Sequence, residues 1–276
     1  MDAKGYVSAL DEFRKSAIML ICEYCGTQTP SAGDICLCFN CESMVITTRA
    51  ILERRDHTLV DTLDSINKNI NDMNYEAAVP LYEKLIADRK DPSLMYAAAI
   101  LYLKYSNYEI TQIGYAKIGF MEENTIHRDK GAKLASTAKK LLTKSISVAN
   151  AEIAKGNMPL SLVYNRFLAQ IKMGGVKGAK ESIELLQKTG NEYIYNYASM
   201  VFESRMEHYD NALKIADKLT DQKSFSVNAF YYIGLALFKK RKIKDAKMVL
   251  EELNVTLKNN NLEALLFEIN AQLEIY

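Results

Sequence analysis

The sequence predicts a mainly α-helical protein with a small β-hairpin module, rich in cysteine, near its N-terminus. Only 4 prolines and 12 glycines interrupt 276 residues in which the helix formers Ala, Leu, Lys and Glu are abundant. All five cysteines lie between Cys22 and Cys41, and in the second half alanines recur at intervals of 33 and 34 residues. Such a period is typical of stacked helix pairs. We therefore expect an N-terminal helix and cysteine module over 1–48 and a helix-pair solenoid over 49–276.

Composition places the chain among ordinary globular proteins. It has 49% hydrophobic and 25% charged residues and a formal net charge of +1, which excludes wholesale disorder and shows no bulk attraction to nucleic acid. Acidic and basic residues at 11–15 precede an apolar run of only six residues, 17–22, which is too short for a secretory core or a membrane span. The sequence predicts a cytoplasmic protein without membrane association.

The cysteines form two Cys-x-x-Cys pairs, Cys22 with Cys25 and Cys38 with Cys41, separated by twelve residues. Two residues between cysteines allow a tight turn that directs both sulfurs at one metal ion. Turn-forming residues within 30–34 can bring the pairs together on the ends of a short hairpin. This spacing resembles a zinc ribbon, and the resemblance implies a zinc ion held by these four cysteines.

The predicted zinc is structural, because four thiolates leave no coordination position for water or substrate. In so small a module the metal would supply folding energy on the order of 10 kcal/mol. Two departures from the ribbon pattern stand out. Glu42 occupies a position where glycine is more usual, and Cys36 is an alternative ligand because residues 36 and 38 of an extended segment share a face. A redox pair and reduced cysteines without metal stay open as alternatives.

The helical repeat is clearest in three segments, 159–186, 193–219 and 228–253, which align on Ala179, Ala212 and Ala246. Each alanine falls in the first turn of a second helix that follows an aromatic-rich first helix. This pattern resembles the tetratricopeptide repeat (TPR), which implies a superhelix of helix pairs. The family's large, small, apolar, small and bulky positions are filled in the last segment by Phe230, Gly234, Leu237, Ala246 and Leu250.

The repeat pattern weakens in the middle of the chain. A further second helix is predicted within 74–92, followed by a helix that opens at Pro92. Residues 110–157 lack the expected small residue and contain several glycines, so we expect them to diverge from the repeat, with a long helix over about 129–154. The end of the chain, from residue 259, is expected to form a last helix that caps the stack.

The TPR resemblance implies a concave groove that binds an extended protein segment. Tyr164, Tyr197 and Tyr231 recur at intervals of 33 and 34 residues on first helices and can form a column of hydroxyl groups in that groove, beside Asn165. The alternative is that these tyrosines pack between helices. The family's clamp for a carboxylate needs Lys and Arg on first helices, whereas this chain has Asn228 and Tyr232 there. Recognition of an acidic C-terminus is therefore not predicted.

We find no sequence pattern of a catalytic centre, and the sequence predicts a non-enzymatic scaffold or adaptor whose partner is a protein or peptide. A nucleic-acid-associated factor is the alternative, since residues 128–188 hold twelve Lys and Arg against four Asp and Glu. The basic run Lys239–Lys242 is expected to lie in a solvated turn between repeat helices. No Lys or Arg lies between Asp34 and Arg49, which weakens a phosphate-binding role for the cysteine module.

Overall fold

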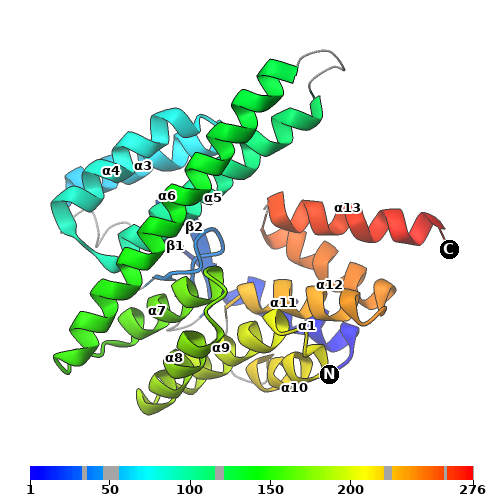
Figure 1. Cartoon of the computed structure of the whole chain (residues 1–276). Coiled ribbons are helices and arrows are strands. Elements are labelled where there is room, and N and C mark those ends of the chain that lie inside the picture. The colour runs from blue at the N-terminus through cyan, green and yellow to red at the C-terminus, as the bar shows by residue number, and fades with distance from the viewer. Residues whose placement is uncertain (33–35, 46–55, 116–120, 221–225, 258–259, 276) are drawn as a thin grey trace. The chain divides into compact units, whose positions relative to one another are not determined.

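The computed structural model describes residues 1–32, 36–45, 56–115, 121–220, 226–257 and 260–275 (Figure 1). Over these ranges the protein is mainly α-helical, with twelve helices and two short β-hairpins near the N-terminus. None of these helices combines the length and the apolar character needed to cross a membrane. The chain divides into two compact units, which we treat separately: one of Met1–Cys22, Thr27–Arg49 and Lys180–Tyr276, the other of Glu23–Gly26 and Ala50–Ala179.

The cysteine region forms two antiparallel hairpins. In the first, β1 (Ile18–Ile21) pairs with β2 (Gln28–Ser31), so that Ile21 lies opposite Gln28. In the second, β3 (Cys36–Leu37) pairs with β4 (Met44–Val45). The sequence led us to expect one hairpin with a cysteine pair at each end. Instead, each cysteine pair lies at the turn of its own hairpin.

The N-terminal helix α1 (Ala3–Ser16) belongs to the first unit and packs against α12 (Ile243–Thr256). Its start is fixed by the Asp2 carboxylate, which accepts a hydrogen bond of 2.9 Å from the Gly5 backbone N–H. Helical spacing places Tyr6, Leu10 and Phe13 on one buried face. At the other end, the guanidinium of Arg14 donates a hydrogen bond of 2.7 Å to the Thr256 hydroxyl, so the first and last parts of the sequence are joined by polar as well as apolar contacts.

The rest of the first unit is a run of helices in which each packs on the next. These are α9 (Glu192–Arg205), α10 (Tyr209–Thr220), α11 (Asn228–Lys239), α12 and α13 (Asn260–Ile275). A methyl group at Gly234 on α11 would overlap the Leu250 side chain on α12. Gly234, which fills the small position of the TPR resemblance, therefore lets these two helices approach closely. The predicted C-terminal helix is present as α13.

The second unit contains α3 (His57–Asn71), α4 (Tyr75–Arg89), α5 (Pro92–Tyr115), α6 (Met121–Ala154) and α7 (Leu160–Lys172), while α8 (Val176–Lys188) begins in it and ends in the first unit. Helices α5 and α6, of 24 and 34 residues, lie along each other (Figure 1). The divergence expected at 110–157 thus corresponds to a long helical hairpin. It encloses the buried carboxylate of Glu109, which forms an ion pair of 3.0 Å with Lys130.

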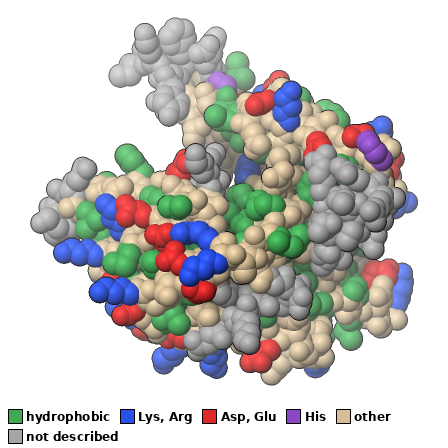
Figure 2. Space-filling model, turned by 180° about the vertical axis from the view of Figure 1, so that it is seen from behind, with side chains coloured by type: hydrophobic (Ala, Val, Ile, Leu, Met, Phe, Trp, Pro, Cys, Tyr) green, Lys and Arg blue, Asp and Glu red, His purple; other side chains and the backbone are tan. Residues whose placement is uncertain are grey.

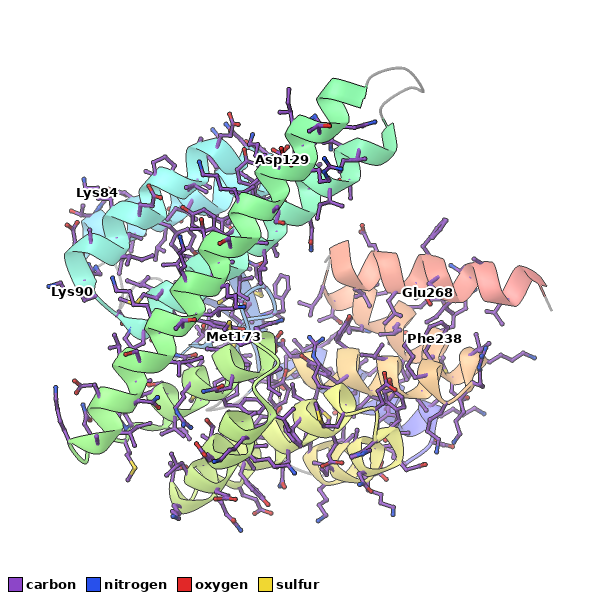
Figure 3. The ribbon with its side chains drawn as sticks, in the orientation of Figure 1. Lys84, Lys90, Asp129, Met173, Phe238 and Glu268 are labelled. Atoms are coloured by element: carbon purple, nitrogen blue, oxygen red, sulfur yellow. The ribbon has the colours of Figure 1, made fainter. Side chains whose placement is uncertain are left out.

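Five of the described helices end in the same turn. A residue with positive φ follows α3, α6, α7, α9 and α11, and these residues are Met73, Gly156, Gly174, Glu207 and Arg241. In each turn the next N–H bonds back to the carbonyl five residues earlier, at 2.8 to 3.1 Å, as in a Schellman motif. Figure 3 shows Met173, the residue before Gly174, where α7 ends. The last three turns repeat at intervals of 33 and 34 residues. The basic run Lys239–Lys242 begins at the last residue of α11 and continues through one of these turns, between the two helices where it was predicted.

Candidate metal centre

The structure brings together the four cysteines that the spacing predicted. The sulfurs of Cys22, Cys25, Cys38 and Cys41 all lie within 4.8 Å of one another, and all four side chains are buried. The Cys22 and Cys41 sulfurs are 3.7 Å apart. Zinc–sulfur bonds of about 2.3 Å in a tetrahedron set neighbouring sulfurs about 3.8 Å apart. The arrangement therefore fits a zinc ion with only small adjustments of the side chains.

The first cysteine pair lies in the turn between β1 and β2, which is closed by a hydrogen bond of 2.9 Å from the Cys22 N–H to the Thr27 carbonyl. After the second cysteine, Gly26 has φ of +73°, a conformation that costs glycine little. Residues 23–26 pack on α3 and α4: a methyl group at Gly26 would overlap the Leu63 carbonyl, and the Tyr82 hydroxyl donates a hydrogen bond of 2.7 Å to the Tyr24 carbonyl. Backbone contacts thus hold this turn.

The second cysteine pair lies in the turn between β3 and β4, where the Cys38 N–H donates to the Ser43 carbonyl at 2.8 Å. Glu42 follows the second cysteine and has φ of +62°, the same left-handed conformation as the glycine of the first turn. Side chains of α11 hold this turn. The amide of Asn228 donates a hydrogen bond of 3.1 Å to the Cys38 carbonyl, and the Tyr232 hydroxyl donates one of 3.1 Å to the Glu42 carboxylate.

Cys36 stands apart from the four-sulfur cluster. Its thiol points to the Pro30 carbonyl, 3.8 Å from the sulfur, rather than to the other cysteines. Burial chiefly raises the pKa of the Cys36 thiol to about 12, the neighbouring Cys38 raises it further, and a hydrogen bond with Ser31 opposes the rise. The question left by the sequence, Cys36 or Cys38, is answered in favour of Cys38 in the cluster.

The residues predicted to line a groove are mostly inside the protein. Tyr164 and Tyr197 have no exposed surface, and Asn165 is 1% exposed. The Asn165 amide donates a hydrogen bond of 2.5 Å to the Ser93 hydroxyl. These positions correspond to the alternative in which the side chains pack between helices. Tyr231 is half-buried and lies 5.5 Å, centroid to centroid, from the ring of Tyr232.

Sequence reasoning missed the part played by Glu42, Asn228 and Tyr232 around the second cysteine pair. Each carried a signal. Glu42 stood out where a glycine was expected, and the two α11 residues stood out where the TPR resemblance called for basic side chains. The sequence could not show that these residues are close in space, because 186 positions lie between Glu42 and Asn228 in the numbering. Only the fold brings them side by side.

Comparison of the chain with protein families, curated proteins and solved structures finds no match. The chemistry of the centre therefore follows from its own donor set. Four buried sulfurs can hold a soft or borderline divalent ion such as zinc, and they occupy all four positions of a tetrahedral site. Such a centre can stabilise the fold, and it has no position for a reacting water.

Proposed function

We propose that this protein is a non-enzymatic scaffold or adaptor in which a structural zinc ion fixes the cysteine module and the helical array binds a protein partner. The observation that carries this proposal is the four-sulfur cluster, whose buried sulfurs can fill all four positions of a tetrahedral zinc site. A side chain of the helical array, Asn228 on α11, forms a hydrogen bond with one of the cysteine turns. A metal site of this kind organises a surface without taking part in a reaction.

The array is proposed to be TPR-like over 159–253. Three features support this. Ala179, Ala212 and Ala246, the predicted small positions, are all buried to 1% exposure or less. The helices of this segment are 12 to 14 residues long. Their first members end in the same left-handed turn at intervals of 33 and 34 residues, which is the period of the repeat.

The distribution of charge favours a protein partner over nucleic acid. In the basic stretch 128–188, Lys130 is ion-paired with Glu76 and Glu109, and Lys155 is paired with Glu152. On the face shown in Figure 2, basic and acidic side chains are interspersed. Binding of a phosphate backbone needs several cations on one surface, so internal pairing of this kind weakens that alternative.

The test is affinity purification of the full chain from its native cell, with zinc quantified on the same sample. We expect about one equivalent of zinc. We also expect a protein partner that stays bound as the salt concentration is raised from about 50 to about 500 mM, a range over which binding through phosphate contacts is lost. Zinc below about half an equivalent would contradict the structural metal. A nucleic acid that is released steeply by salt would contradict the protein partner.

A further inference from the structure

Helix α6 carries an uncompensated run of positive charge within the second unit. Between Asp129 and Glu152 the sequence has five lysines and no acidic residue. One of them, Lys130, is paired with Glu76 and Glu109. The side chains of the other four are exposed and form no ion pair or hydrogen bond within the part of the chain that the structure describes; these are Lys133, Lys139, Lys140 and Lys144. Their charge is therefore available to a ligand.

Three of these lysines, Lys133, Lys140 and Lys144, lie along one side of α6, and we call them the lysine stripe. An α-helix turns by about 100° per residue, so these positions fall within about 40° of one another and about 10 and 6 Å apart along the axis. They lie opposite the buried side of the helix, whereas Lys139 lies on its flank. The buried side is defined by Gly131, Ala138, Leu142, Ser145 and Ala149.

The lysine stripe suits an anionic ligand. Each ammonium group offers three hydrogen-bond donors and no acceptor. Because residues 131–151 include no acidic side chain, the three charges repel one another, and an anion laid along the stripe relieves that repulsion. The exposed hydroxyls of Ser136 and Ser147 lie beside the stripe on the same helix and add two further donors.

Two features favour a protein segment over nucleic acid. Helix α6 contains no Phe, Tyr or Trp, so it offers no ring on which a base stacks. The stripe also lacks arginine, whose planar guanidinium holds a phosphate through two hydrogen bonds. Carboxylates on an acidic segment, by contrast, pair with the lysines one at a time. The stripe therefore fits a segment rich in Asp and Glu.

We propose that the lysine stripe of α6 binds an acidic segment of the protein partner, whose carboxylates pair with Lys133, Lys140 and Lys144. The proposal rests on the proposed function, since it names the chemistry of that partner and adds a contact outside the TPR-like segment 159–253. Exposed ion pairs are individually weak, so the stripe adds to the affinity and orients the partner, while the helical array supplies the salt-resistant part of the binding.

The test uses the full-length zinc-loaded protein and labelled probes, with binding followed by fluorescence anisotropy at about 50 mM salt, where screening is weak. The probes are capped repeats of Glu-Glu-Ser and of Gln-Gln-Ser and an oligothymidylate of the same length. We expect the Glu peptide to bind about thirtyfold more tightly than the Gln peptide, the product of three ion pairs of about threefold each. The oligothymidylate is expected to bind more weakly than the Glu peptide.

Two adjacent lysines provide a matched pair of variants. Lys140→Gln and Lys139→Gln each remove one exposed, unpaired ammonium group from α6, but only Lys140 belongs to the stripe. We expect Lys140→Gln to weaken binding of the Glu peptide about threefold and Lys139→Gln to weaken it by less than about 1.5-fold. Replacing all three stripe lysines by Gln is expected to weaken it about thirtyfold. Gln is as good a helix former as Lys, so these exposed substitutions leave the fold intact, which circular dichroism checks.

Several outcomes would overturn the proposal. These are equal affinity for the Glu and Gln peptides, equal losses in Lys139→Gln and Lys140→Gln, or unchanged binding when all three stripe lysines are replaced. An oligothymidylate that binds at least as tightly as the Glu peptide, and is weakened by the same variants, would assign the stripe to nucleic acid.

The scaffold function has a separate readout. Exposed ion pairs are screened at about 500 mM salt, so a partner retained there reports on the helical array alone. A partner that binds the wild type and the triple Lys→Gln protein equally at about 50 mM salt would reject the stripe as a contact while leaving the scaffold intact.

Discussion

The two cysteine turns have the same number of residues between their cysteines, and in each the residue after the second cysteine has a left-handed conformation. They are nevertheless held in place by different contacts. The first uses Gly26, whose missing side chain makes room for the Leu63 carbonyl of α3. The second uses Glu42, whose side chain is a hydrogen-bond partner of Tyr232 on α11. The comparison teaches that one local geometry can be kept for close backbone packing in one place and for a side-chain contact in another.

The largest effect is expected from removing one ligand of either turn. We expect Cys25→Ser and Cys41→Ser to lose zinc equally, because four sulfurs share one ion, and to lose stability on the order of 10 kcal/mol, enough to unfold the module. The measurements are zinc content by mass spectrometry and thermal unfolding followed by circular dichroism. A chelator added to the wild type is expected to reproduce the change.

Cys36→Ser is the matched control, since it also removes a buried thiol from the same segment. We expect this variant to keep one equivalent of zinc, because Cys36 lies outside the four-sulfur cluster. Zinc loss in Cys36→Ser with zinc retained in a Cys38→Ser protein would show that the ligand set is misassigned.

The next effect separates the two turns. Gly26→Ala adds a methyl group that overlaps the Leu63 carbonyl, in a conformation that alanine adopts poorly, and we expect destabilisation of about 2 to 5 kcal/mol. Denaturant unfolding with the zinc bound measures it. Gly190→Ala is the control, because Gly190 has φ of +76° and nothing within 4 Å of the added methyl group, so only about 1 to 2 kcal/mol of backbone strain is expected. Equal costs at both glycines would mean that the packing on α3 does not constrain the turn.

A smaller effect is expected where α4 supports the first turn. Tyr82→Phe leaves the Tyr24 carbonyl without its side-chain donor, at a cost of about 1 to 2 kcal/mol. Tyr195→Phe provides the comparison, since Tyr195 is half-buried on α9 and its hydroxyl has no hydrogen bond among the described residues. The same unfolding measurement applies to both. No difference between the two variants would argue that this hydrogen bond contributes nothing.

The smallest effect is expected at Glu42. Glu42→Gly removes about 1 to 2 kcal/mol of left-handed strain and loses the hydrogen bond that Tyr232 donates, worth about 1 kcal/mol, so we expect these two contributions to change the free energy of unfolding by less than about 1 kcal/mol. The contrast with Gly26→Ala sharpens the comparison, because one exchange of glycine is tolerated and the other is not. A loss of more than about 2 kcal/mol in Glu42→Gly would show that this side chain is needed for the fold itself.

The metal ligands were predictable because their geometry is local. Two residues between cysteines already confine the sulfurs of one pair, and the structure adds only the meeting of the two pairs. The choice between Cys36 and Cys38 was not local. In an extended segment both residues share a face, but the strand ends at Leu37, and Cys38 enters the turn while Cys36 stays against Pro30.

The helix pairs were predictable from the alanines, which recur once in each helix pair at a position where two helices pack closely. The turns between them were not, because Met73, Gly174, Glu207 and Arg241 share a conformation but no side-chain chemistry. The prediction that the recurring tyrosines line a groove failed for Tyr164 and Tyr197, because both are buried. Residues Leu162–Ala169 of α7 are all buried, so its helical periodicity could not identify an exposed face.

By itself, the sequence determined the two Cys-x-x-Cys pairs, the mainly helical class and the small residues at which helices pack closely, because each follows from residues near one another in the chain. Only the tertiary structure decided that Cys36 lies outside the cluster, that Tyr164 and Tyr197 are buried, and that Asn228 meets the second cysteine turn. Burial and long-range contact depend on how many elements surround a residue. That number is fixed by packing between distant segments, which local spacing does not encode.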